Sequence, residues 1–142
     1  MKLVIASDHA GLELRQELVT LLKERSVSFD DLGPTTRDSV DYPDFAVQVS
    51  RAVASGAYTL GVLVCGTGIG MSMVANKHRG IRAALCSTEF EARMARAHAQ
   101  HVGVVVGAGV ARAILEAFIA TPFEGGRHEK RVQKIRDAET AR

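Results

Sequence analysis

A cysteine followed by glycines at alternate positions is the strongest chemical signal in the sequence. The run reads Cys65-Gly66-Thr67-Gly68-Ile69-Gly70 and stands between an apolar stretch and a helical pattern. Glycines let backbone N–H groups turn toward an anion, and the beginning of a helix favours negative charge and the thiolate form of cysteine. The run therefore predicts an oxyanion cradle beside a basic thiol. The alternative is that Cys65 is a small buried core residue.

An acid and an imidazole, Asp8 and His9, directly follow the apolar run at residues 3–6. In a parallel α/β fold, polar groups at the carboxyl ends of strands line the ligand crevice. This position indicates a functional pair. The alternative is that Asp8 caps the next helix and His9 lies on the surface.

Further along the chain, His98 and His101 stand three residues apart. No other Cys, His or acid lies at metal-ligand spacing from them, so we expect no metal site. Either histidine is suited to proton transfer near neutral pH, and the pattern alone does not choose between them.

Two arginines, Arg127 and Arg131, lie four residues apart after a Gly-Gly pair, on one face of a predicted helix. Two guanidinium groups on one face suit the dianion of a phosphate monoester. A solvated basic face is the alternative.

Apolar runs alternate with helical periodicity along the whole chain, which predicts βαβ units. We expect five strands, at residues 3–6, 27–32, 60–65, 81–86 and 102–106. The prediction is a Rossmann-like α/β fold, a three-layer sandwich with a five-stranded parallel sheet, in a single domain over residues 1–142. The charged segment 127–138 has only one narrow apolar stripe. It is expected to be a C-terminal helical arm on a partner subunit, or else a frayed solvated helix.

Composition excludes several classes of protein. The 142 residues are 46% hydrophobic and 24% charged, with a formal net charge of +2, which is typical of a globular domain and gives no basis for nucleic-acid or membrane partners. Aromatic residues make up only 5%, without Trp, so platforms for stacked bases are not expected. The apolar start of the chain is short for a signal peptide, and two cysteines without a CxxC pair favour a cytoplasmic location.

Collinear motifs give the chain a resemblance to a known family. They are Asp8-His9-Ala10-Gly11, Asp41-Tyr42-Pro43, the glycine run after Cys65, Ala75-Asn76-Lys77, Gly80-Ile81-Arg82-Ala83 and Gly125-Gly126-Arg127-His128. In this order they resemble the type B ribose-5-phosphate isomerases, a family that includes galactose-6-phosphate and allose-6-phosphate isomerases.

The resemblance implies an aldose–ketose isomerase that needs no metal or cofactor and interconverts ribose 5-phosphate and ribulose 5-phosphate through a cis-enediolate. It also implies a homodimer, or a tetramer built from such dimers, in which two subunits contribute to each active site. The implied catalytic residues are Cys65 as base, Thr67 in the enediolate cradle, His98 for opening the sugar ring and Asp8 on the sugar hydroxyls or as a proton shuttle. The implied binding residues are His9, Arg127 and Arg131 for phosphate, Tyr42 as a pocket wall, and the amides of Gly66, Gly68 and Gly70.

The chain departs from the family pattern at three positions. Ala99 and Gln100 stand where the family has Asn and Asp, and Gly109 stands where it has an arginine, whose place we expect Arg112 to take. These departures leave two alternatives: an isomerase of a six-carbon sugar phosphate (allose 6-phosphate or galactose 6-phosphate), or a non-catalytic subunit that binds sugar phosphates. A nucleotide-binding function is disfavoured because the glycine spacing does not match the dinucleotide fingerprint.

Overall fold

The computed structural model describes residues 1–99, 102–106 and 111–141, with the backbone alone for 102–106. Helices and strands alternate along the chain, as the apolar pattern predicts. The elements are β1 (Lys2–Ser7), α1 (Leu12–Glu24), β2 (Ser28–Asp31), α2 (Tyr42–Ala54), β3 (Leu60–Val64), α3 (Ile69–Ala75), β4 (Arg82–Cys86), α4 (Glu89–His98), β5 (Val102–Val106), α5 (Ala111–Ala120) and α6 (Arg127–Thr140).

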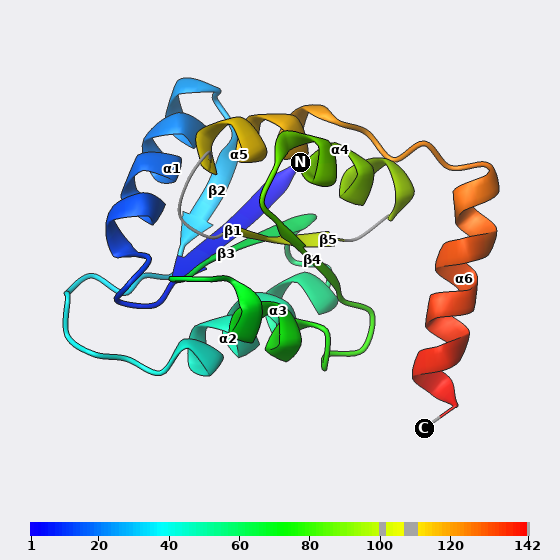
Figure 1. The fold of residues 1–142 in the computed structure, drawn as a ribbon, viewed down its shortest axis with the longest axis horizontal. Coiled ribbons are helices and arrows are strands. Elements are labelled where there is room, and N and C mark those ends of the chain that lie inside the picture. The colour runs from blue at the N-terminus through cyan, green and yellow to red at the C-terminus, as the bar shows by residue number, and fades with distance from the viewer. Residues whose placement is uncertain (100–101, 107–110, 142) are drawn as a thin grey trace.

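The strands form one sheet in the order β2-β1-β3-β5-β4, and each neighbouring pair is parallel. Helices α1, α4 and α5 cover one face of the sheet, and α2 and α3 cover the other (Figure 1). The predicted α/β fold with a parallel sheet is therefore confirmed. Because all strands run the same way, every strand-to-helix connection leaves the same edge of the sheet, which we call the carboxyl edge. The opposite edge, where the strands begin, is the amino edge.

The central strands β1 and β3 are buried on both faces, which explains why they are apolar without alternation, whereas the edge strand β2 is polar and largely exposed. In β1, Leu3 and Ile5 pack with α1 and α5, whereas Val4 and Ala6 pack with α2 and α3. All four side chains are inaccessible to solvent. The helices are held against the sheet by these two apolar layers.

Helix α3 begins at Ile69, two residues earlier than the Met71 expected from the sequence pattern. The reason is Gly68, which precedes the helix with φ +78°, a left-handed conformation that glycine adopts without strain. The glycine run is thus partly a tight turn and partly the first turn of the helix. Tyr42 similarly begins α2 one residue before the expected Pro43.

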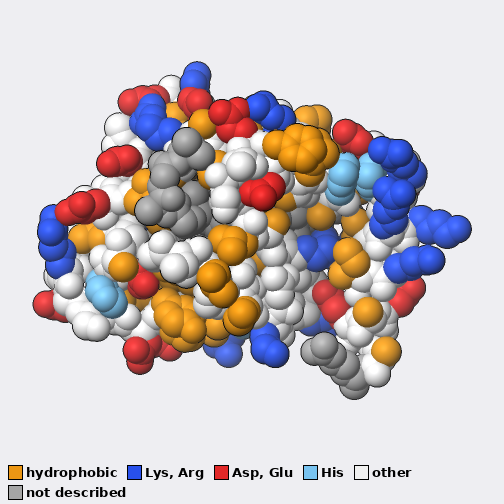
Figure 2. Space-filling model, viewed as in Figure 1, with side chains coloured by type: hydrophobic (Ala, Val, Ile, Leu, Met, Phe, Trp, Pro, Cys, Tyr) orange, Lys and Arg blue, Asp and Glu red, His pale blue; other side chains and the backbone are white. Residues whose placement is uncertain are grey.

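Helix α6 stands apart from the sheet, at the right of Figure 1. A groove of about 320 Å³ separates it from the connection between α3 and β4. Figure 2 shows this hollow and the Lys and Arg side chains that gather over the first half of α6. One contact that spans the groove is a hydrogen bond from the Gly80 backbone N–H to Glu139, at 3.0 Å. None of the helices in the described ranges combines the length and the apolar character required to cross a lipid bilayer.

The close packing of α2 on Gly61 in β3 leads to a prediction about stability. An added Cβ would lie 2.7 Å from Cγ1 of Val49 and 3.2 Å from Cγ2 of Val53, so α2 packs directly on the bare backbone. We expect Gly61→Ala to lower the free energy of unfolding by about 1–3 kcal/mol through overpacking, as measured by urea denaturation. Val49→Ala removes the closest clashing atom, so the double variant should lose less than the sum of the two single losses. Additive losses would contradict this explanation.

Candidate active site

The residues at the carboxyl edge of β1 and β3 form what we call the thiol cluster: Asp8, His9, Tyr42 and the run Cys65–Gly70. Asp8 and Cys65 follow directly after neighbouring strands, and the backbone N–H of Asp8 donates to the carbonyl of Val64 at 3.2 Å. A Cβ at Gly11 would lie 2.6 Å from that same carbonyl oxygen. The loop after β1 therefore lies against the end of β3, and only glycine fits at position 11.

Cys65 is 6% exposed and lies at the base of the glycine turn. The backbone N–H of Gly68 donates to its Sγ atom at 3.0 Å. Gly66 and Thr67 beside it are exposed, and Thr67 Oγ1 accepts from the Ile69 N–H at 3.3 Å. Cys65 is thus buried at the edge of the apolar core, directly beside the exposed part of the glycine turn.

Asp8 is buried, with 8% of its surface exposed, and its Oδ1 accepts a hydrogen bond from the Gly11 N–H at 2.8 Å. Helix α1 has Gly11 at its N-cap without a side-chain cap, so the carboxylate of Asp8 stabilises the turn that precedes the helix. His9 is exposed, and its Nδ1 accepts from the Val40 N–H at 3.2 Å, which joins it to the loop that leads into α2.

Tyr42 lies over the glycine turn at the beginning of α2. A Cβ at Gly70 would be 2.6 Å from Cζ of the Tyr42 ring, so the ring rests on the backbone of Gly70. The ring is 39% exposed. Three separate loops therefore bring the predicted residues of the thiol cluster together.

The other predicted residues, His98, Arg127 and Arg131, lie at the opposite edge of the sheet. His98 is the last residue of α4, which brings the chain back to the amino edge, where β5 begins at Val102. Strand β3 ends beside the far end of β5, since Val64 pairs with Val106. The five residues of β5 span about 16 Å at roughly 3.3 Å per residue, so His98 and Cys65 of one chain do not meet.

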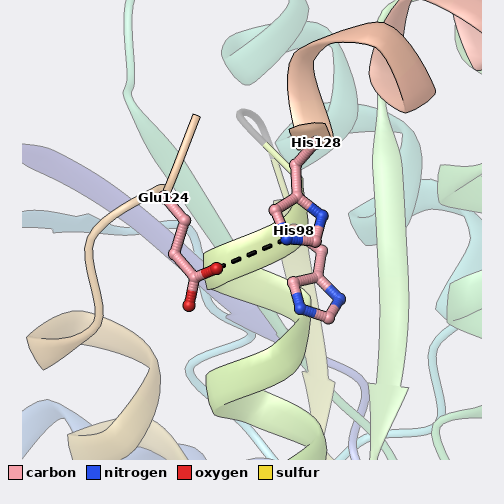
Figure 3. Close-up of side chains that lie close together, drawn as sticks. All are labelled: His98, Glu124 and His128. Carbon is pink, nitrogen blue, oxygen red and sulfur yellow. Dashed lines mark ion pairs between the residues drawn. The ribbon is translucent and has the colours of Figure 1, made fainter. Parts of the chain in front are cut away.

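Two further residues, Glu124 and His128, join His98 (Figure 3). The rings of His98 and His128 are stacked, with centroids 4.0 Å apart and planes inclined by 11°. Oε2 of Glu124 is 3.3 Å from Nε2 of His128, and Nε of Arg127 is 3.2 Å from the same nitrogen. We call the five residues His98, Glu124, Arg127, His128 and Arg131 the arginine cluster.

Sequence reasoning missed this grouping because it considered only the spacing around His98. The ligand atoms of His98, Glu124 and His128 lie within 4.8 Å of one another, which is close enough to hold a metal ion. The guanidinium groups of Arg127 and Arg131 disfavour a cation there, since both also lower the pKa of His128. Burial contributes most to that lowered pKa, so His128 is neutral at pH 7. The Glu124–His128 spacing of four residues was the available signal.

The structure describes the surroundings of two of the residues connected with the departures from the family pattern, Ala99 and Arg112. Ala99 directly follows α4 and packs against the apolar core, whereas Gln100 and Gly109 lie outside the described residues. Nη2 of Arg112 is 2.9 Å from Oε2 of Glu24, in an exposed ion pair between α5 and α1. Arg112 therefore has a carboxylate partner in place of the phosphate that the sequence argument assigned to it.

Comparison with known proteins assigns the chain to a family. The family model described as Ribose/Galactose Isomerase matches residues 3–135. The ribose-5-phosphate isomerase B of Escherichia coli is 40% identical, over 99% of this chain and 98% of that protein. The type B ribose 5-phosphate isomerase of Trypanosoma cruzi has a TM-score of 0.95 at 40% identity, covering 100% of both chains.

A third relative was solved with a sugar phosphate. The structure of ribose-5-phosphate isomerase B from Mycoplasma genitalium with bound ribulose-5-phosphate has a TM-score of 0.88 at 38% identity, over 99% of this chain and 97% of that one. The protein belongs to the ribose/galactose isomerase family.

The two free cysteines, Cys65 and Cys86, should differ sharply in reactivity. Cys86 is 1% exposed, and burial, reinforced by Glu91, raises the pKa of its thiol to about 11. At pH 8 only about one Cys86 in a thousand is then a thiolate. We expect iodoacetamide at pH 8 to label Cys65 well before Cys86, as measured by peptide mass spectrometry. Cys65→Ser should remove the fast phase, and equal labelling of both sites would contradict this assignment.

Proposed function

We propose that this protein is an aldose–ketose isomerase that interconverts ribose 5-phosphate and ribulose 5-phosphate. Its family membership and the names of its relatives in Escherichia coli and Mycoplasma genitalium support the substrate class. The observation that carries the reaction type is the Cys65 sulfur, 3.0 Å from an amide of the glycine turn at the carboxyl edge. Binding a sugar phosphate requires no thiol in that place.

In the proposed reaction, the Cys65 thiolate removes the proton at C2 of the open-chain aldose and returns it at C1, while a second proton passes from the C2 hydroxyl to the C1 oxygen. The Gly68 N–H donates to the sulfur and so holds the Sγ atom against the glycine turn. Negative charge then develops on the enediolate oxygens, and the Thr67 hydroxyl and the amides of Gly66 and Gly70 are the donors nearest to them. Tyr42 forms the wall of the pocket at Gly70, and Asp8 orients the sugar hydroxyls.

The remaining steps belong to the arginine cluster. His98 opens the sugar ring, and Arg127 and Arg131 bind the phosphate together with His9, which lies in the thiol cluster. Arg127 and Arg131 begin α6 on exposed positions, as a phosphate site requires. Phosphate binding holds the sugar in place and supplies binding energy that serves the reacting carbons.

We infer that the active form is a homodimer in which each site combines the thiol cluster of one subunit with the arginine cluster of the other. The separation of the two clusters across the sheet supports this inference. In the described part of the chain, all three guanidinium nitrogens of Arg82 in the groove beside α6 lack hydrogen-bond partners, although Arg82 is only 8% exposed. Ile135 on α6, which lines the same groove, exposes 46% of its surface. A second subunit under α6 would cover these groups, so α6 acts as the arm.

The free thiols Cys65 and Cys86 agree with a reducing compartment, and we place the protein in the cytoplasm. Six-carbon sugar phosphates remain the alternative substrates because Ala99 replaces a polar residue of the family pattern next to His98.

The function is tested by kinetics on a panel of ribose 5-phosphate, allose 6-phosphate and galactose 6-phosphate. We expect the highest kcat/KM for ribose 5-phosphate, and we expect Cys65→Ala to lower turnover by about 10²- to 10⁴-fold, the usual contribution of a general base. Binding of ribose 5-phosphate, measured by calorimetry, should change only a few-fold. Full activity in Cys65→Ala would overturn the role of the thiol, and a wild-type preference for six carbons would change the substrate.

Shared sites predict recovery of activity in mixed dimers. Cys65→Ala and His98→Ala each reduce both sites of their own dimer to a small residual turnover, but a mixed dimer has one intact site. After unfolding and refolding a 1:1 mixture, we expect about a quarter of wild-type activity from random pairing in a two-fold dimer. The matched control mixes Cys65→Ala with Cys65→Ser, which share the same defect. No recovery in the first mixture would show that the two residues act within one chain or not at all.

A further inference from the structure

His128 is the most deeply buried member of the arginine cluster, with only 2% of its surface exposed. It lies one residue after Arg127, at the beginning of α6, and its ring covers one face of the exposed His98 ring (Figure 3). The two ring planes are nearly parallel. The stack therefore leaves the edge of the His98 ring accessible but restricts rotation of that ring about its side-chain bonds. The orientation of His98 therefore depends on the position of His128.

A single atom of His128, Nε2, has two competing partners. Arg127 donates to it through Nε at 3.2 Å, which requires a lone pair on Nε2. Glu124 lies 3.3 Å away through Oε2, which requires a proton on Nε2. A neutral imidazole satisfies one of these contacts at a time. Arg127 and Glu124 are thus alternative partners of the same nitrogen.

The second ring nitrogen favours one of the two arrangements. Nδ1 of His128 is buried and lacks a hydrogen-bond partner within the described ranges. With the proton on Nε2, the only N–H of the neutral ring is paired with Glu124. With the proton on Nδ1, a buried N–H is left unpaired, which is costly. The Glu124 arrangement is therefore favoured as soon as Arg127 has another partner.

A substrate phosphate is such a partner. The groups that face His128 are His98 from α4, Glu124 from the connection before α6, and Arg127 and Arg131 from α6 itself. Arg127 and Arg131 are the phosphate ligands of the proposed function, and His98 is its ring-opening histidine. His128 thus contacts both the phosphate end and the ring-opening end of the proposed site.

We propose that His128 is a positioning residue that holds the His98 ring in its stacked orientation and exchanges Arg127 for Glu124 at Nε2 when Arg127 binds the substrate phosphate. This inference rests on the proposed isomerase function. The lowered pKa of His128 agrees with this role. A neutral imidazole has one N–H and one lone pair, and the exchange at Nε2 needs both forms of that nitrogen.

A double-mutant cycle tests whether His128 acts through His98. We expect His128→Ala to lower kcat for ribose 5-phosphate by about 10- to 100-fold, as displacement of a catalytic group does. In a His98→Ala background the same change should cost less than about twofold. His128→Phe keeps an aromatic ring in the stack and should recover most of kcat. Equal losses in both backgrounds, or no rescue by Phe, would overturn the positioning role.

The exchange at Nε2 is tested at Glu124. Without its carboxylate, departure of Arg127 leaves the Nε2–H of His128 unpaired, so Glu124→Ala should raise KM for ribose 5-phosphate by about three- to tenfold with a smaller change in kcat. Glu129→Ala, the same change at an exposed glutamate five residues further along, in the first turn of α6, should leave both constants unaltered. An unchanged KM in Glu124→Ala would overturn the exchange.

Proton NMR of the unliganded protein separates this inference from the proposed function. The ring-current shift of the His98 ring protons should be present in the wild type, lost in His128→Ala and retained in His128→Phe. A wild type that does not isomerise ribose 5-phosphate would overturn the proposed function. The spectra would still show whether the His98 ring stacks on His128. Identical His98 shifts in all three proteins would overturn the inference whatever the activity.

Discussion

The common direction of the strands is the constraint on which the rest of the structure depends. In a parallel sheet each crossover helix must carry the chain back to where strands begin, so loops at one edge lead out of strands and loops at the other lead into them. Asp8 and Cys65 follow strands, and His98 precedes one. No rotation of side chains brings these groups together within a chain of this topology. The direction of the backbone therefore keeps the thiol cluster and the arginine cluster at opposite edges of the sheet.

Much of this architecture could be predicted from the sequence, because apolar runs without alternation are typical of strands buried on both faces. The predictions failed by one or two residues where a local feature overrode the pattern. Glycine in a left-handed conformation at position 68 allows α3 to begin before the first apolar residue of its stripe. The role of Gly61 was also invisible in the sequence, because it depends on how closely Val49 approaches from another element.

Most of the thiol cluster was foreseeable because Asp8, His9 and the run Cys65–Gly70 follow strand ends, where position in the chain determines position in space. Tyr42 begins α2 after a long loop, and only the family resemblance pointed to it. The arginine cluster was only half foreseen. Its arginines are close together in sequence, but the stack of His98 on His128 joins segments 30 residues apart in numbering, and no spacing rule relates them. The partner of Arg112 was not foreseeable either, because Glu24 lies on another helix, 88 residues away in numbering.

On the proposed function, a base and its proton-transfer partner lie at opposite edges of one sheet, and this separation affects how activity begins in a cell. On the proposed assembly, a newly synthesised subunit is chemically silent, since it has a sulfur without the imidazole that must prepare its sugar. Catalytic output at low abundance would then rise with the square of the subunit concentration. A damaged subunit would also inactivate a site to which its intact partner contributes. The loss of activity caused by damage would therefore depend on how subunits pair.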